Sequence, residues 1–292
     1  MRRHRDLTGW LFVSPWVIGF LLFKLGPFLA SVGLSFTRYN LLTPPRPVGT
    51  ANYRALLHDD ALFLHALGVT LRYALVSVPL ATLVALGLAL LLNHNVRGVA
   101  LFRAIVYLPS ILPAVATSIV FVWLLNPETG LVNVALRQFG VEGPAWLGDA
   151  KWAPWSLVLI SLWGVGGAVI IYLAGLKDVP LGLYEAATMD GANAWRRTRH
   201  ITLPSLRPVV FFNVVMATIT AFQAFTEPFV LFNGAGGPED SGLFVSVYLW
   251  NRTWRYLDLG YASAMAWMLF AITVLALAAL FAAQRRWGGD AL

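Results

Sequence analysis

Two carboxylates stand among small residues in the polar segment 177–208. Glu185 is followed by two alanines, and Asp190 is followed by Gly191. A carboxylate can accept paired hydrogen bonds from an arginine, and small residues let another surface approach the backbone closely. The residue types therefore predict a docking surface for a partner. The alternative interpretation is a solvated loop whose arginines lie at lipid headgroups.

The spacing around these carboxylates predicts a helix-turn-helix elbow. Asp178 and Pro180 suit the start of a helix, which we expect over Leu181–Met189. Gly191 then ends this helix, because glycine readily adopts the left-handed conformation that closes a helix. A second short helix is expected from about Ala192 to His200, before the prolines that precede the next apolar run.

The sequence lacks the residues that metal binding, disulfide formation and ATP binding require. The histidines are scattered without the spacing of metal ligands, and the chain has no cysteine, which excludes thiolate metal sites and disulfides. The glycine-rich stretch Gly234–Pro238 lacks the lysine and Ser/Thr of a phosphate-binding loop, so the chain itself is not expected to bind ATP. The sequence predicts no catalytic residues, no metal site and no cofactor bound by this chain.

The composition indicates lipid as the solvent for much of the surface. Of the 292 residues, 58% are hydrophobic and only 12% are charged. A soluble domain normally carries about 25% charged residues. The net charge of +7 would suit nucleic acid, but the basic residues lie mostly between long apolar runs, where membrane topology alone explains them. Nucleic acid is therefore not an expected partner.

Six apolar segments are long enough to cross a bilayer, which takes about 20 helical residues. They are Trp10–Phe36, Leu67–Leu92, Leu101–Leu125, Trp155–Leu176, Val209–Phe232 and Tyr261–Ala283. Helices are expected, because only a helix satisfies every backbone group within such a segment. Kinks are expected at prolines in or at the ends of spans, namely Pro15, Pro27, Pro79, Pro109 and Pro113.

The arginines and lysines set the expected orientation. They are concentrated before the first span, after the second, in segment 177–208 and after the last span, which places both termini in the cytoplasm. The expected organisation is a cytoplasmic N-terminus (1–9), a six-span domain (10–283) and a cytoplasmic tail (284–292). A cleaved signal peptide is the competing interpretation of the start, but the first apolar run is too long and lacks a clear cleavage site.

Segment 177–208 resembles the EAA loop of ABC-importer permeases. That signature reads EAA-x3-G-x9-I-x-L-P, and no position departs from it. The matching residues are Glu185, Ala186, Ala187, Gly191, Ile201, Leu203 and Pro204. The wider stretch Tyr184–Pro208 resembles the carbohydrate branch of this family, with the maltose, lactose and glycerol-3-phosphate permeases. Further stretches of that branch resemble Leu108–Asn133, Ile171–Leu176, Phe225–Pro238 and Gly260–Ala264.

The resemblance implies an all-α fold with six transmembrane helices, as in type I ABC importers. In that family two permeases form the pore, and each EAA loop forms a coupling helix seated in a groove of a cytoplasmic ATPase dimer. ATP and Mg bind the ATPase, and an extracytoplasmic binding protein delivers the sugar. The implied docking residues are Glu185, Ala186, Ala187, Asp190, Gly191, Ala192, Leu203 and Pro204. A sister permease in the cytoplasmic membrane of a bacterium or archaeon is the implied second subunit.

Polar side chains inside the spans are the candidates for sugar contacts, because such groups usually face the bundle interior or a water-filled cavity. In the fifth span, Asn213, Thr220, Gln223 and Glu227 lie near one helical stripe. We single out Asn213, Gln223 and Trp123. A hydrogen bond between helices is the alternative for the polar residues, and a place in the interfacial belt is the alternative for the tryptophan.

Competing functions make distinct predictions. An intramembrane enzyme should show clustered carboxylates for metal, and a secondary transporter should show internal repeats or charges at mid-membrane. The sequence shows no such carboxylate cluster and no convincing internal repeat. A permease for another polar solute, such as a peptide, stays open, because the EAA loop is shared more widely than sugar specificity. The acidic pair Asp59-Asp60 is expected to be solvated, and Arg72 to extend toward the headgroups.

Overall fold

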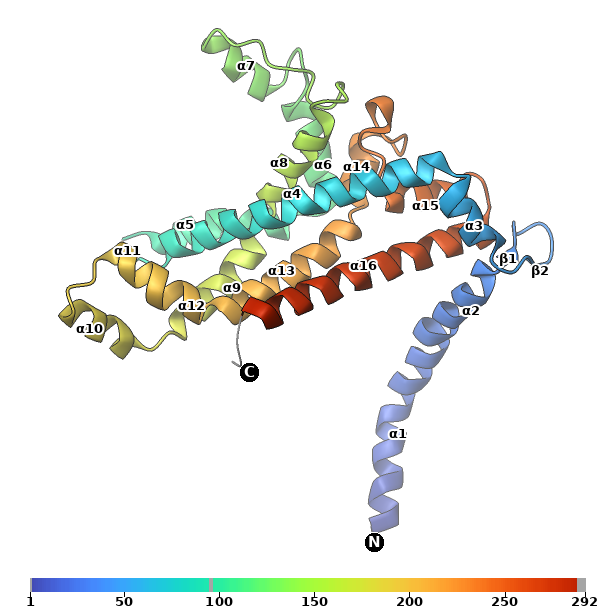
Figure 1. Cartoon of the computed structure of the whole chain (residues 1–292), viewed down its shortest axis with the longest axis horizontal. Coiled ribbons are helices and arrows are strands. Elements are labelled where there is room, and N and C mark those ends of the chain that lie inside the picture. The colour runs from blue at the N-terminus through green and yellow to red at the C-terminus, as the bar shows by residue number, and fades with distance from the viewer. Residues whose placement is uncertain (1, 95–96, 288–292) are drawn as a thin grey trace. The chain divides into compact units, whose positions relative to one another are not determined.

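The structure, a computed structural model, describes residues 2–94 and 97–287 and is mainly helical (Figure 1). The chain divides into two compact units. The first comprises residues 1–64 and 249–271, and the second comprises residues 65–248 and 272–292.

The first unit holds the N-terminal helices and a small hairpin. Its elements are α1 (Arg2–Phe20), the π-helical turn η1 (Leu21–Leu25), α2 (Gly26–Ser35), β1 (Thr37–Arg38), β2 (Arg46–Pro47) and α3 (Ala51–His58). The two strands pair antiparallel, with Thr37 opposite Pro47. The start of α4 (Ala61–Leu92), the end of α15 (Val245–Trp254) and the first part of α16 (Leu259–Trp287) complete this unit.

The predicted first span is confirmed as one continuous helical stretch, Trp10–Ser35. It passes through η1 just before Pro27. Because proline cannot donate a backbone hydrogen bond, the α-helical pattern must adjust next to it, and a π turn is one such adjustment. In the most apolar stretch of this span, the share of residues buried by the described part of the chain is 0%. Its surface is left for lipid or another chain.

The second unit contains the remaining helices. They are α5 (Val99–Tyr107), the 3-10 turn η2 (Leu108–Ile111), α6 (Ala114–Leu124), α7 (Leu131–Gln138), α8 (Ala153–Trp163), α9 (Gly166–Lys177), α10 (Leu181–Met189), α11 (Ala194–Arg197), the π turn η3 (Thr198–Thr202), α12 (Leu203–Ser205), α13 (Arg207–Phe222), α14 (Thr226–Leu231) and the 3-10 turn η4 (Pro238–Asp240). The larger part of α4 and the end of α16 belong here as well.

The core of the second unit lies between α4 and α9. Ala85 and Ala89 of α4 are fully buried, as are Tyr172 of α9 and Leu206, which precedes α13. The small alanines leave room beside α9, and the large side chain of Tyr172 packs into this core at interior density. This packing fixes α9, which leads directly into the elbow.

Two of the six expected spans are broken. The kink expected at Pro113 is confirmed, but it is a complete break, so one helix over Leu101–Leu125 is wrong. The helical stretch Val99–Ile111 and α6 meet there at an angle of 100°. Leu112, which precedes Pro113, is extended at ψ 140°. The ring of a proline disfavours helical geometry in the residue before it, which explains the break.

The single helix expected over Trp155–Leu176 is also wrong, since α8 and α9 are bent by 47° around Gly164. No proline marks this break in the sequence. Near the break, Gly166 lies so close to α5 that a Cβ atom at this position would be 2.4 Å from the carbonyl oxygen of Val106. Only glycine fits this approach. Four single helices and these two bent pairs, each counted as one span, agree with the six-span expectation.

Candidate functional site

The first arm of the elbow has the bounds that the sequence predicted, Leu181–Met189. Gly191 has a φ of +74°. Its backbone N–H donates to the carbonyl of Thr188 at 3.0 Å, and the N–H of Ala192 donates to Ala187 at 2.8 Å. This pair of bonds is a Schellman motif, which satisfies carbonyls that the helix end leaves open. Pro180 directly precedes α10, as expected, but the expected role of Asp178 in this helix start is wrong, because Asp178 follows the last residue of α9.

The second arm begins later and continues further than the expected Ala192–His200. The side chain of Asn193 accepts a hydrogen bond from the backbone N–H of Arg196 at 2.9 Å and so caps α11. The chain then passes through η3 into α12, which contains Leu203 and Pro204. Tyr184 and Thr202 join the two arms through their hydroxyls at 2.9 Å. The elbow is therefore a defined structure and not an irregular loop.

The outer surface of the elbow combines carboxylates with exposed apolar groups. Glu185 and Asp190 are exposed, and their side chains make no hydrogen bond or ion pair with the described residues. Met189 is 90% exposed and Trp195 is 68% exposed. Ala186 and Gly191 are exposed, whereas Ala187, Ala192, Leu203 and Pro204 are half-buried. Exposed apolar side chains surrounded by charge are typical of a protein interface.

A hollow of about 670 Å³ lies between α4, α8, α9, α13 and α14. The predicted polar stripe of the fifth span faces it in full, since Asn213, Thr220, Gln223 and Glu227 all contribute to its lining. Further polar lining comes from Tyr73, Ser77, Thr82, Ser161, Tyr172 and Thr226. Hydroxyl, amide and carboxylate groups on apolar walls are suited to a polar solute with several hydroxyls.

The candidates in this hollow differ in how much hydrogen-bonding capacity remains. Asn213 is buried, and its side-chain N–H donates to the carbonyl of Val209 at 2.9 Å. Gln223 is exposed and makes no side-chain hydrogen bond with the described residues. The buried hydroxyls of Thr82 and Tyr172 also lack a partner of normal geometry there. Thr82 was not predicted from the sequence, although a hydroxyl within an apolar span was a usable signal.

Trp123 does not join these residues. Its side chain is 72% exposed on α6 and contributes nothing to the lining of the hollow. Nearby, the side chain of Asn126 accepts hydrogen bonds from the backbone N–H groups of Glu128 and Thr129 at 3.0 and 2.9 Å. Asn126 therefore shapes a turn. The alternative interpretation for Trp123, a place in the interfacial belt, stays open.

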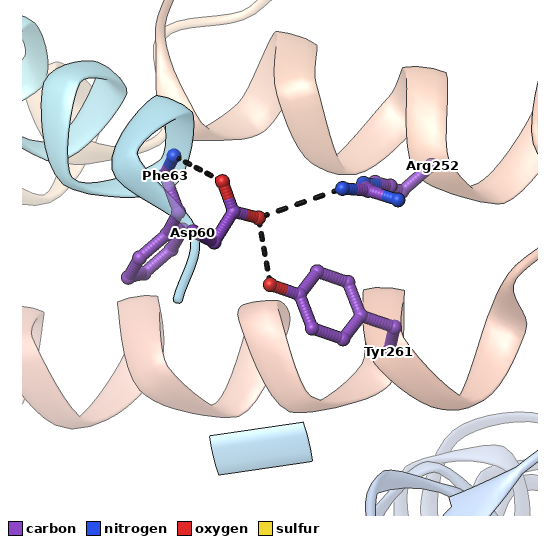
Figure 2. Close-up of polar contacts among 4 residues, drawn as sticks. All are labelled: Asp60, Phe63, Arg252 and Tyr261. Atoms are coloured by element: carbon purple, nitrogen blue, oxygen red, sulfur yellow. Dashed lines mark hydrogen bonds and ion pairs between the residues drawn. The ribbon is translucent and has the colours of Figure 1, made fainter. Parts of the chain in front are cut away.

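The expectation that Asp60 is solvated is wrong. Its side chain is only 10% exposed and lies 3.6 Å from Nη2 of Arg252 (Figure 2). One carboxylate oxygen accepts a hydrogen bond from the hydroxyl of Tyr261 at 2.6 Å. The other caps α4 by accepting from the backbone N–H of Phe63 at 2.9 Å. No group of three or more His, Asp or Glu side chains suited to a metal ion occurs among the described residues.

Comparisons with known proteins agree with these features. Residues 77–287 match the family described as binding-protein-dependent transport system inner membrane component. YesP of Bacillus subtilis, a probable ABC transporter permease, is 41% identical over 287 residues, covering 98% of this chain and 93% of that protein. LacF of Rhizobium radiobacter, a lactose transport system permease, is 34% identical over 293 residues. The match covers 98% of this chain and 97% of LacF.

A solved structure shows the same fold. A chain of a bacterial alginate ABC transporter, crystallised in complex with an alginate pentasaccharide-bound periplasmic protein, superposes with a TM-score of 0.86. The match covers 99% of this chain and 98% of that chain at 22% sequence identity.

Proposed function

The chain belongs to the family of inner membrane components of binding-protein-dependent transport systems, and we propose that it forms half of a pore that imports a sugar or an oligosaccharide. It is a multi-pass permease component of the ABC importer type, which carries no catalytic site of its own. The carbohydrate assignment is supported by relatives named for lactose and for sulfoquinovosyl glycerol. The polar hollow beside α13 is where we expect the sugar to pass, with Asn213 and Gln223 as contacts.

The exposed elbow supports a second proposal, which concerns the ATPase partner. We infer that α10 docks on a cytoplasmic ATPase dimer, which holds ATP and Mg. Glu185, Asp190 and the exposed Met189 suit a groove lined by arginines and apolar groups. ATP-driven closure of the ATPase would move α10, and α9 and the η3–α13 stretch would pass that movement to the spans. Such a change requires that each state make different contacts.

The remaining partners follow from this role. A second permease, which we expect to be a sister chain, would cover the exposed surface of the Trp10–Ser35 span. An extracytoplasmic binding protein would deliver the sugar. Both termini would be cytoplasmic, on the same side as the elbow, as the distribution of Lys and Arg favours.

A pull-down of the tagged chain from its own membrane in mild detergent tests the proposal. We expect a nucleotide-binding ATPase and a second six-span permease to co-purify, identified by mass spectrometry. A co-purifying binding protein would then be screened against sugars and peptides. Recovery of the chain alone, under conditions that keep a known importer intact, would contradict the proposal and favour a self-sufficient transporter.

A further inference from the structure

A second hollow, of about 430 Å³, lies between the end of α4, α5 and α9. It is separate from the polar hollow beside α13. Most of its lining is aliphatic and comes from α5 and α9, including Val106, Ile170 and Leu173. Two cationic side chains, Arg103 and Lys177, complete it. The walls therefore suit a hydrocarbon chain, and the cations suit an anion.

The two cations are held in different ways. Nε and Nη2 of Arg103 donate to the carbonyl of Leu92 at 3.3 and 2.8 Å, which fixes the guanidinium at the end of α4. Lys177 is exposed at the end of α9 and makes no hydrogen bond or ion pair with the described residues. No acidic side chain contributes to the lining that the structure describes. The positive charge of the hollow is thus not neutralised within it.

The surface around this hollow is apolar and exposed. Phe102 is 55% exposed, Ile105 is 57% exposed and Ile170 is 46% exposed. An occupant that reaches the hollow from a bilayer would carry both an acyl chain and a headgroup. A sugar suits it poorly, because Tyr107 is the one hydroxyl-bearing side chain among its described lining residues.

We propose that this hollow binds one anionic phospholipid, with the phosphate at Arg103 and Lys177 and an acyl chain along α5 and α9. Basic pockets between membrane helices on the cytoplasmic side bind such headgroups in other proteins. Only residues 178–180 separate α9 from α10. The lipid would therefore brace α9 directly before the elbow. Its placement in the cytoplasmic leaflet rests on the proposed function of the elbow.

The test measures lipid retention by the assembled transporter in native mass spectrometry. Phosphatidylglycerol, phosphatidylcholine and inorganic phosphate are added separately to the delipidated complex. We expect retention of phosphatidylglycerol above phosphatidylcholine. Lys177→Gln should lower the affinity for phosphatidylglycerol roughly fivefold, the effect of one basic group near an anionic lipid. Ala174→Trp, at an exposed position on the wall, should fill the hollow and abolish retention.

Matched variants control for general effects. Lys151→Gln removes the same charge from a lysine outside this hollow, and Ala278→Trp adds the same bulk to an exposed position on α16. Both should retain phosphatidylglycerol as the unmodified complex does. Equal retention of the two lipids, binding of inorganic phosphate alone, or normal retention by Ala174→Trp would each overturn the proposal. Sugar uptake is measured in parallel, so that loss of the lipid site and loss of the transport function are told apart.

Discussion

The elbow of α10 and α11 and the cluster around Asp60 both carry carboxylates outside the apolar core, but they use them differently. In the cluster, Asp60 is almost buried and is bonded to Tyr261, Arg252 and the backbone of α4 (Figure 2). In the elbow, Glu185 and Asp190 are exposed, with no side-chain partner among the described residues.

The difference separates stabilising charges from charges available to a partner. A buried carboxylate must be paired, since leaving it unpaired costs free energy of folding. An exposed carboxylate adds little to stability and remains free to bind. Substitutions in the cluster should therefore lower stability first, and substitutions in the elbow should lower transport first.

The largest effect is expected for Gly191→Asp. A Cβ atom there would meet no atom within 4 Å, and the left-handed backbone costs a non-glycine residue roughly 1–2 kcal/mol, so the protein should still fold. The added carboxylate would stand on the proposed docking surface. Sugar uptake should fall roughly 5- to 150-fold, the usual range of coupling between sites. Uptake is measured in vesicles at equal amounts of folded transporter.

Gly140 provides a matched control for that substitution. It closes α7 in the same Schellman motif, with a φ of +76°, and a Cβ atom at Gly140 would likewise meet no atom within 4 Å. The Gly140 N–H donates to Arg137 and the Val141 N–H donates to Leu136, each at 3.0 Å. Gly140→Asp should carry the same backbone strain and leave uptake near normal. Equal losses in the two variants would show that backbone strain, and not docking, explains the result.

The second effect concerns the cluster. Asp60→Asn removes the charge that faces Arg252 and weakens the bond to Tyr261, so the free energy of unfolding should fall by about 1–3 kcal/mol. Thermal unfolding of the purified transporter, followed by intrinsic fluorescence, measures this loss. Uptake per folded molecule should not change. A variant that unfolds normally but transports poorly would place Asp60 in the transport cycle and erase the contrast with the elbow.

A smaller effect is expected for Glu185→Gln. The side chain is exposed, so thermal unfolding should not change. Loss of one charged contact to the ATPase should lower ATPase recovery and uptake by up to about fivefold, as for an exposed ion pair. Quantitative mass spectrometry of the pull-down gives the recovery. Normal ATPase recovery together with reduced thermal stability would show that Glu185 stabilises the fold and does not bind the ATPase.

The smallest effect is expected in the polar hollow, outside both regions. Gln223→Ala removes a side chain that lines the hollow and has no hydrogen-bond partner among the described residues. Losing one hydrogen bond to the sugar should raise the KM for uptake about twofold, the lower end of the range for a single hydrogen bond, with unchanged ATPase recovery. Trp123→Ala is the comparison, because Trp123 lies outside the hollow. Unchanged kinetics in Gln223→Ala would remove it from the sugar path.

Features set by local geometry could be predicted from the sequence. Gly191 ends α10 as expected, because only the left-handed conformation closes the helix there and glycine adopts it freely. Asn213 and Thr220 face one hollow, because helical periodicity places them on one side of α13. Gln223 follows the end of α13 and Glu227 lies in α14, yet both still line the same hollow. The apolar runs themselves located all six spans or broken spans.

Features set by contacts between distant segments could not be predicted. The break before α9 lies where Gly166 approaches α5 closely. A glycine in an apolar run does not by itself predict such a break. The cluster joins Asp60 to residues about 200 positions later in the chain, such as Tyr261. In each case the structure depends on a contact with a segment that is distant in the sequence.

The length of α4 has a consequence for the membrane that houses it. A helix of 32 residues is roughly 48 Å long, whereas the hydrocarbon core is about 30 Å thick. Nε of Arg72 donates to the carbonyl of Gly68 at 3.1 Å, which turns this cation back toward the beginning of the helix. The helix must therefore tilt, or its first turns must project among the headgroups. A thinner bilayer would increase this mismatch, and a thicker bilayer would reduce it.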